Sequence, residues 1–256
     1  MNAFSYRVQT LQPSAIREIL KFTSDPEVIS FAAGNPAPEA FPTEEIARIT
    51  NEILTTTPID ALQYSITEGY TPLRNWIKDD LKKKGMFDES EEDVVITSGA
   101  QQAIEVVTKE ICNEGDVIIC EAPTFIGSLN AFRSYNSKLV GIDMDDDGIN
   151  IEKLEAALEK YQRTAFIYLI PNFQNPTGKT MSLEKRKKVL ELAQKYNVYI
   201  LEDNPYGDLR YLGEDVPTIK SLDKTGHVLY AGTFSKTLAP GLRVGYLCAP
   251  KNVIAK

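Results

Sequence analysis

Residues 164–203, "TAFIYLIPNFQNPTGKTMSLEKRKKVLELAQKYNVYILED", decide the fold. The apolar run at 164–170 is rich in aromatic and β-branched residues and is typical of a buried strand. At 182–196 apolar residues recur at helical spacing behind Ser182, a residue type that caps helix N-termini, and a second apolar run follows at 197–201. Short strands that alternate with helices in this way indicate an α/β fold with a largely parallel sheet.

The alternation continues in both directions from this segment. The predicted strands are 93–97, 116–120, 138–142, 164–170, 197–201, 227–231 and 242–248. The predicted helices are 71–85, 98–112, 149–160 and 182–196, and the buried stripe of the first is formed by Leu73, Trp76, Ile77 and Leu81. We therefore predict a three-layer α/β sandwich whose central sheet is mostly parallel and has about seven strands. The Pro-rich segment at 32–45 separates an N-terminal arm from this domain.

The composition is that of an ordinary globular protein, with 43% hydrophobic and 25% charged residues among 256. Its 28 basic and 36 acidic residues give a net charge of −8, which repels a nucleic-acid backbone but is compatible with a local pocket for a small anion. Three cysteines and a single histidine, His227, disfavour a disulfide framework and a zinc site. No targeting pattern or membrane-length apolar run is present. We expect a cytoplasmic protein that binds no nucleic acid, membrane or metal.

Unusual polar residues follow four of the predicted strands. Ligands of open α/β sheets bind outside the carboxyl ends of the strands, so these residues are expected to share one edge. The first group, "SGAQQ" at 98–102, opens a helix with free backbone N–H groups, which suits a phosphate. The other strand ends offer an amide, a carboxylate with a phenol, and an amine with two hydroxyls: Asn175; Asp203 and Tyr206; Lys236 with Thr233 and Ser235.

Together these groups match the needs of one cofactor, pyridoxal 5'-phosphate. It requires an amine that forms an imine, a carboxylate that holds a pyridinium proton, hydroxyl donors for a phenolate, and a helix dipole with a cation for the phosphate. Taken singly, each motif has a plainer interpretation, because Asn-Pro-x-Gly is usually a turn and an Asp at a strand end is usually a local cap. The combination of all four favours the cofactor.

Six motifs, in family order, resemble the fold-type I pyridoxal-phosphate aminotransferases of class I/II. They are "SFAAGNPAPEAFP", "LQYSITEGYTPLR", "SGAQQA", "NPTG", "EDNPYGDLRY" and "FSKTLAPGLRVGY". Within the family they point to the branch that contains aminoadipate aminotransferases and the aminotransferase-like domains of MocR-type regulators. The resemblance implies an arm and small-domain segment at 1–45 and a cofactor-binding large domain at 46–256. It also leads us to expect a C-terminal small domain after Lys256, with the arginine for the substrate α-carboxylate.

The resemblance assigns a role to each position that matches a family motif. Lys236 carries the cofactor as an imine and then moves a proton at the substrate Cα, because neighbouring cations lower the pKa of an amine and let it act as a base. Asp203 pairs with the pyridine nitrogen, and Asn175 and Tyr206 donate to the phenolate oxygen. Phe125, in "APTF", lies on the ring face.

Phosphate and substrate contacts are also implied by the resemblance. The phosphate ligands are the backbone of Gly99, Ala100 and Gln101 and the side chains of Thr233, Ser235 and Arg243. In the implied homodimer, Tyr64 reaches the phosphate of the partner chain. Gly34 and Asn175 are implied to contact the substrate. Arg17 matches an arginine that reads the distal carboxylate of aminoadipate or glutamate, although an arginine on a helix surface is an equal alternative.

We therefore predict an aminotransferase that exchanges an α-amino group between an amino acid and a 2-oxo acid, with 2-oxoglutarate as a candidate, by a ping-pong route. A β-eliminating lyase, which shares every cofactor contact, stays open, as does the sensor domain of a transcription regulator. Other motifs fail: a P-loop would need glycine at 230 and 235, where the chain has Tyr230 and Ser235. Neither G-x-G-x-x-G after a strand nor G-x-S-x-G occurs, so a dinucleotide fold and a hydrolase triad are not supported.

Overall fold

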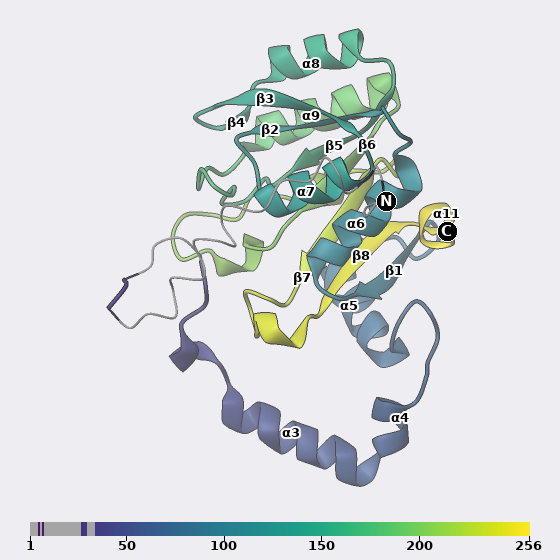
Figure 1. The fold of residues 1–256 in the computed structure, drawn as a ribbon, viewed down its shortest axis with the longest axis vertical. Coiled ribbons are helices and arrows are strands. Elements are labelled where there is room, and N and C mark those ends of the chain that lie inside the picture. Colours follow the sequence, from purple (N-terminus) through teal and green to yellow (C-terminus); the bar gives the residue numbers. More distant parts are fainter. Residues whose placement is uncertain (1–4, 6, 8–26, 30–33) are drawn as a thin grey trace. The chain divides into compact units, whose positions relative to one another are not determined.

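The computed structural model describes residues 5, 7, 27–29 and 34–256 (Figure 1). The chain divides into two compact units, Met1–Gln63 and Tyr64–Lys256. The described part of the first unit contains a 3-10 turn (Pro38–Ala40) and helices α3 (Thr43–Thr56) and α4 (Pro58–Leu62). The expected domains, 1–45 and 46–256, remain a prediction.

The second unit is built on an eight-stranded sheet with the order β1-β8-β7-β6-β5-β2-β3-β4. The strands are β1 (Glu92–Thr97), β2 (Val117–Ala122), β3 (Lys138–Asp145), β4 (Gly148–Ile149), β5 (Thr164–Leu169), β6 (Tyr199–Asp203), β7 (Val228–Thr233) and β8 (Gly245–Pro250). The seven predicted strands are confirmed, with ends shifted by up to three residues. The two-residue β4, which has no counterpart in the prediction, pairs only with β3 at the edge of the sheet.

The direction of β8 decides which loops meet. Strands β2, β3, β5, β6 and β7 pair in parallel, whereas β8 runs antiparallel to both β1 and β7. The amino end of β8 therefore lies at the same edge as the carboxyl ends of the parallel strands. Gly245, the first residue of β8, pairs with Thr97 at the end of β1 and with Thr233 at the end of β7. We call this side of the sheet the carboxyl edge.

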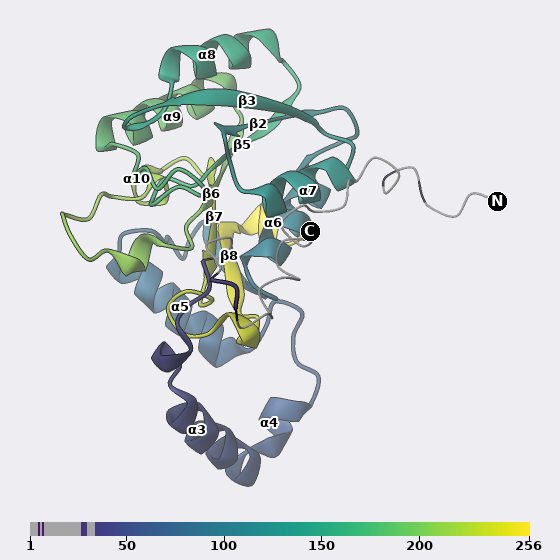
Figure 2. The ribbon, with the colours of Figure 1, turned by 60° about the vertical axis from the view of Figure 1, so that its left-hand side comes forward.

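Helices cover both faces of the sheet, as predicted for a three-layer sandwich (Figures 1 and 2). Alternate residues of β2 show why: Ile119 packs with α8 and α9 on one face, and Ile118 packs with α6 and α7 on the other. The helices are α5 (Thr71–Lys83), α6 (Ala100–Ile111), α7 (Ile126–Ser134), α8 (Ile151–Lys160), α9 (Leu183–Tyr196), α10 (Ile219–Leu222) and α11 (Lys251–Ile254), with 3-10 turns at Gly207–Leu209 and Pro240–Leu242.

Two predictions about single helices have different outcomes. The side chain of Ser182 accepts the backbone N–H of Lys185 and begins α9, as predicted. In α5 the buried stripe is narrower than predicted, because it follows i, i+4 spacing through Ile77 and Leu81, each 1% exposed. Trp76 flanks that stripe and is 58% exposed, so its assignment to the core is wrong.

In the ranges that the structure describes, no helix is long and apolar enough to cross a membrane. The same residues include no group of three or more His, Cys, Asp or Glu side chains placed to hold a metal ion. Cys112, Cys120 and Cys248 are buried and free. Burial raises the pKa of each thiol, to about 11 for Cys112 and Cys120 and about 12 for Cys248, so all three are inert at neutral pH.

Candidate active site

The residues that the sequence assigned to the cofactor within one chain gather at the carboxyl edge. Asp203 and Thr233 are the last residues of β6 and β7, and Lys236 follows β7 by three positions. Phe125 and Asn175 lie in the loops after β2 and β5. The strand order thus places these side chains along one edge of the sheet in the second unit, where ligands of α/β sheets bind.

A cradle for an anion forms between the start of α6 and the segment before β8. Gly99 has a φ of +78°, and a Cβ there would collide with the guanidinium of Arg243. Arg243 donates from Nη2 to the carbonyl of Ser98 (3.0 Å) and from Nη1 to that of Pro240 (3.1 Å). At Gly245 a Cβ would lie 2.6 Å from the Gly99 carbonyl carbon, so glycine allows β8 to approach. The guanidinium stands at the positive end of α6, which suits a phosphate.

The segment from the last residue of β7 to Lys236 carries two hydroxyls, those of Thr233 and Ser235. The Ser235 backbone N–H donates to Thr233 Oγ1 (3.2 Å), and the two hydroxyl oxygens lie 3.0 Å apart. The Lys236 amine is partly buried, and this burial lowers its pKa. Burial, and not the neighbouring cations expected from the sequence, is therefore the cause. A lowered pKa increases the share of the neutral amine, which is the nucleophilic and basic form.

Asp203 is a buried carboxylate, 4% exposed, with one oxygen engaged and one open. Its Oδ2 accepts the hydroxyl of Tyr168 (2.7 Å), and the same hydroxyl oxygen accepts the Ser128 hydroxyl (2.8 Å). Its Oδ1 has no hydrogen-bond partner among the described residues. Burial raises the pKa of Asp203 to about 6, while the Tyr168 bond acts in the opposite direction. An open buried carboxylate oxygen of this kind is a ready acceptor for a positively charged N–H group.

Replacing Tyr168 with phenylalanine should weaken this carboxylate. The change removes the only side-chain donor to Asp203 that the structure shows, and hydrogen bonds to charged groups contribute about 1.5–3 kcal/mol. We therefore expect the pKa of Asp203 to rise by about 1–2 units, because 1.36 kcal/mol corresponds to one unit. A ¹³C-carboxyl NMR titration measures the shift. Ser128→Ala, which keeps the Tyr168 bond, is the control, and an unchanged pKa in Tyr168→Phe would show that the bond does not tune Asp203.

The amide of Asn175 and the phenol of Tyr206 form a pair. Asn175 Nδ2 donates to the Tyr206 hydroxyl oxygen (3.2 Å), and burial raises the pKa of that phenol, which keeps it protonated. Phe125 precedes α7, and a Cβ on Gly127 would lie 2.5 Å from the Phe125 ring. Gln101, in the first turn of α6, donates from Nε2 to the Gly127 carbonyl (3.2 Å). Glycine at 127 thus lets both side chains pack over the backbone.

Four predicted site residues remain, and one of them, Ala100, belongs to the cradle. Ala100 is the first residue of α6, directly after Gly99. Tyr64 begins the second unit and is 99% exposed. Gly34 is exposed and belongs to the first unit. Arg17 lies outside the described residues. Within the second unit the structure brings together the cofactor ligands expected from this chain, and the roles of Tyr64, Arg17 and Gly34 stay predictions.

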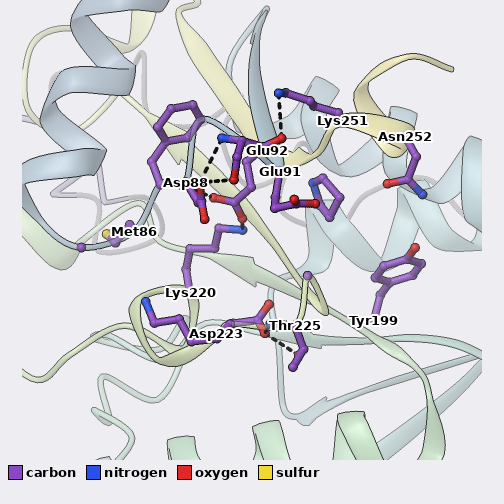
Figure 3. Close-up of a pocket in the computed structure, with 16 residues that line it drawn as sticks. Met86, Asp88, Glu91, Glu92, Tyr199, Lys220, Asp223, Thr225, Lys251 and Asn252 are labelled. Atoms are coloured by element: carbon purple, nitrogen blue, oxygen red, sulfur yellow. Dashed lines mark hydrogen bonds and ion pairs between the residues drawn. The ribbon is translucent and has the colours of Figure 1, made fainter.

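A pocket of about 680 Å³ opens at the other end of the strands, opposite the carboxyl edge (Figure 3). It is lined by Glu92 at the start of β1, Tyr199 at the start of β6 and residues at the end of β8. Two of its lysines are engaged: buried Lys220 forms an ion pair with Glu92 and donates to the Val228 carbonyl, and Lys251 donates to two backbone carbonyls. This network joins β1, β7 and α10 and is separate from the carboxyl edge.

The family described as Aminotransferase class I and II matches residues 26–256 of the chain. The chain belongs to this family. It is 44% identical to the aromatic-amino-acid aminotransferase 1 of Thermococcus litoralis over 257 residues, which cover 99% of this chain and 62% of that protein. It is 39% identical to the 2-aminoadipate transaminase of Thermus thermophilus over 258 residues, or 99% of this chain and 63% of that protein.

The solved structures of aminotransferases agree with this assignment. The kynurenine aminotransferase of Pyrococcus horikoshii, solved in complex with PMP, superposes with a TM-score of 0.93 at 40% identity, covering 99% of this chain and 63% of that chain. The chain thus spans less than two thirds of the length of these relatives. The predicted membership of class I/II is confirmed.

The Pyrococcus horikoshii structure contains PMP, the amine form of pyridoxal phosphate, and the residues at the carboxyl edge of this chain fit that cofactor. The open Oδ1 of Asp203 is placed in a buried site, where a protonated ring nitrogen would satisfy it. The cradle of Gly99 and Arg243 leaves room for no side chain at position 99 and offers a cation with a helix N-terminus. Ring nitrogen and phosphate are the two charged ends of the cofactor, and the edge has a group of opposite charge for each.

Sequence reasoning missed Tyr168 and Ser128, which complete the surroundings of Asp203. Tyr168 lies within the otherwise aliphatic end of β5, and a buried tyrosine hydroxyl usually has a hydrogen-bond partner. That signal could have marked Tyr168 as a polar contact. Its partners could not be named, because Ser128 and Asp203 are 40 and 35 positions away in the chain.

Proposed function

We propose that the protein is a pyridoxal-phosphate-dependent aminotransferase that exchanges an α-amino group between an amino acid and a 2-oxo acid. The observation that carries the proposal is the buried Asp203, whose open Oδ1 shares the carboxyl edge with the partly buried amine of Lys236. Asp203 is suited to hold a protonated ring nitrogen, and Lys236 to attack a carbonyl carbon and to move a proton. The membership of the aminotransferase family supports the same conclusion.

Each residue of the edge has a proposed task. Lys236 would hold the cofactor through its amine and, as a base, would take the proton from the substrate Cα in one half-reaction and return a proton to Cα in the other. Asp203 keeps the ring nitrogen protonated, so that the bound cofactor can accept the electron pair that Cα releases. Asn175 and Tyr206 donate to the ring oxygen, and Phe125 covers one ring face. The cradle residues around Gly99 and Arg243 hold the phosphate.

For the substrates we propose an α-amino acid donor with 2-oxoglutarate as the first acceptor to test. The relatives are named for aromatic amino acids and for 2-aminoadipate, so both classes of donor should be compared. Arg17 is proposed to read the distal carboxylate of an acidic substrate, as the sequence resemblance implies. Gly34 and Asn175 are proposed to contact the substrate as well.

We propose a homodimer in the cytoplasm, in which Tyr64 of one protomer reaches the phosphate bound by its partner. The exposure of Tyr64 supports this, as does a set of exposed apolar side chains in the second unit: Ile66, Tyr70, Trp76, Leu238 and Leu242. Trp76 lies beside Phe234, with ring centroids 6.1 Å apart, which connects α5 to the loop that carries Lys236. The three free cysteines fit a reducing compartment.

Product analysis tests the proposed reaction. The protein, loaded with pyridoxal phosphate, is incubated with one amino acid at a time and 2-oxoglutarate. Transamination yields the corresponding 2-oxo acid and glutamate in equal amounts and no ammonia. Ammonia with pyruvate from serine or cysteine would instead indicate the β-eliminating lyase, and bound cofactor without turnover of any donor would favour the sensor domain.

Changing Arg243 should separate the phosphate contact from the ring contacts. Charge-assisted, two-pronged bonds from arginine are among the strongest that a phosphate receives, so Arg243→Gln should weaken binding of pyridoxal phosphate by about a hundredfold. Arg243→Lys keeps the positive charge but not the two-pronged guanidinium, so its affinity for pyridoxal phosphate should lie between those of the wild type and Arg243→Gln. Absorbance titration measures the affinities. Pyridoxal, which lacks the phosphate, should bind equally to all three proteins, and an equal loss for pyridoxal would contradict the assignment.

A further inference from the structure

Glu121, the next-to-last residue of β2, is a second buried carboxyl group near the carboxyl edge. It is 1% exposed, and its Oε2 accepts the backbone N–H of Ile170 (3.1 Å) and Nε2 of Gln174 (3.3 Å). Both donors lie just after β5. One carboxyl group therefore ties the end of β2 to the segment that follows β5, beyond the backbone ladder of the two strands.

Gln174 extends this tie into both loops. Its Nε2 also donates to the carbonyl of Pro123 (2.8 Å), in the loop after β2. Its Oε1 accepts the backbone N–H (2.9 Å) and the hydroxyl (2.7 Å) of Thr177, in the loop after β5. Every polar atom of the Gln174 side chain is thus engaged. A side chain that is hydrogen-bonded at every polar atom cannot rotate freely, so it restrains the two loops that it connects.

Along the chain, the two ends of the tie come shortly before two residues of the proposed site. Phe125 follows Glu121 by four positions, and Asn175 follows Gln174 by one. We propose that Glu121 is a positioning residue: through Gln174 it fixes the loop that carries Phe125 relative to the loop that carries Asn175, and so fixes both side chains against the cofactor ring. The part of this inference that concerns the ring rests on the proposed function. The coupling of the two loops does not.

The surroundings of Glu121 suggest which substitution preserves the tie. Burial raises its pKa to about 7, and in the described part of the chain it forms no ion pair. The titratable groups that its charge affects, Cys120 and Tyr168, stay protonated at neutral pH. A neutral amide can therefore replace the carboxyl group and accept both bonds through its oxygen, with its NH2 group in the place of Oε1, which has no hydrogen-bond partner among the described residues. Glu121→Gln is the conservative variant, and Glu121→Leu is the variant of similar size that removes the acceptors.

The first experiment needs no cofactor. Hydrogen exchange, read by mass spectrometry on peptides that cover 122–127 and 170–178, compares the two variants with the wild type. Glu121→Leu should raise exchange in both peptides at least about tenfold, whereas Glu121→Gln should stay within about twofold of wild type. Ile119→Val, which removes a methyl group from the same buried strand without touching the tie, controls for a general loss of packing and should leave both peptides unchanged.

The second experiment uses the loaded protein. Because the misplaced groups contact the ring, Glu121→Leu should lower kcat by about ten- to a hundredfold with less than about a twofold change in KM, and should shift the absorbance maximum of the bound cofactor. Glu121→Gln should keep kcat and the absorbance maximum close to their wild-type values. Gln174→Leu should reproduce the loss, and the double variant should lose no more than either single one, because the two residues act as a unit.

The outcomes separate the inference from the proposed function. Loop exchange that rises in Glu121→Leu, with kcat rescued by Glu121→Gln, supports the inference. Equal losses in the Gln and Leu variants, additive losses with Gln174→Leu, or exchange that rises in one loop alone would overturn it. A wild-type protein that binds no pyridoxal phosphate would overturn the proposed function and the ring contact, while the exchange data would still decide whether Glu121 couples the loops.

Discussion

Replacing Lys236 with alanine is expected to lower the rate of transamination by at least about a thousandfold. The residue is proposed to act twice, as the nucleophile that binds the cofactor and as the base that moves the Cα proton. General acid–base catalysis alone contributes about 10²–10⁴. The contacts of Arg243 and Asp203 remain in the variant, so the cofactor should still bind, but without a covalent bond. Single-turnover kinetics, followed through the cofactor absorbance, measure the loss.

Two matched variants complete this test. Lys236→Arg keeps the positive charge but offers no neutral amine, so it should be as inactive as Lys236→Ala. Lys188→Ala changes a lysine that is 58% exposed on α9 and should behave as wild type. If Lys236→Arg kept more than about a tenth of the wild-type rate, a neutral amine at this position would not be required, and both proposed roles of Lys236 would be wrong.

Replacing Asp203 with asparagine is expected to reduce the rate of Cα proton removal by about a hundred- to a thousandfold. A neutral amide no longer favours the protonated ring nitrogen, and in a buried site the loss of that charge is poorly compensated. The amide occupies the same volume and can still accept the Tyr168 hydroxyl, so some cofactor binding should persist. The half-reaction with an amino acid, deuterated or not at Cα, measures the step, and unchanged rates would contradict the role of Asp203.

The same substitution should stabilise the protein without cofactor. The pKa of Asp203 is about 6 in the folded protein and about 3.8 ordinarily, so the folded state binds the proton more tightly than the unfolded state. The free energy of unfolding of the wild type is therefore highest, as far as Asp203 is concerned, below pH 3.8, and it falls as the pH rises to about 6. Two pKa units correspond to about 3 kcal/mol. Urea unfolding should show Asp203→Asn more stable by about this amount at pH 8 and equal to wild type near pH 4. A constant difference across that range would contradict this account.

The strands and the edge of the site could be predicted because they depend on local patterns. Apolar runs of five to seven residues set each strand, and the rule that ligands bind at carboxyl ends placed Asn175, Asp203 and Lys236 together. Prediction is weaker at the border of a buried stripe and in very short elements. Trp76 lies next to a buried position on its helix, and hydropathy alone does not tell a stripe from its flank. The two residues of β4 carry no periodicity at all.

The contacts within the site depend on long-range register and could not be predicted. Arg243 reaches the carbonyl of Ser98 across 145 positions because β8 runs antiparallel between β1 and β7. Glu121 meets Gln174 across 53 positions because β2 and β5 are neighbours in the sheet, although β3 and β4 separate them in the chain. Strand order decides such pairs, and strand order follows from the packing of the whole unit.

Covalent capture of the cofactor tests the central claim most directly. The protein is loaded with pyridoxal phosphate, reduced with borohydride and digested, and the modified peptide is sequenced by mass spectrometry. The account predicts a single pyridoxyl group on Lys236, in the peptide that contains "GTFSKTLAPGLR", and no such label in the Lys236→Ala variant. A label on a different lysine, or no label in a protein that binds the cofactor, would contradict the claim that Lys236 at the carboxyl edge is the catalytic amine.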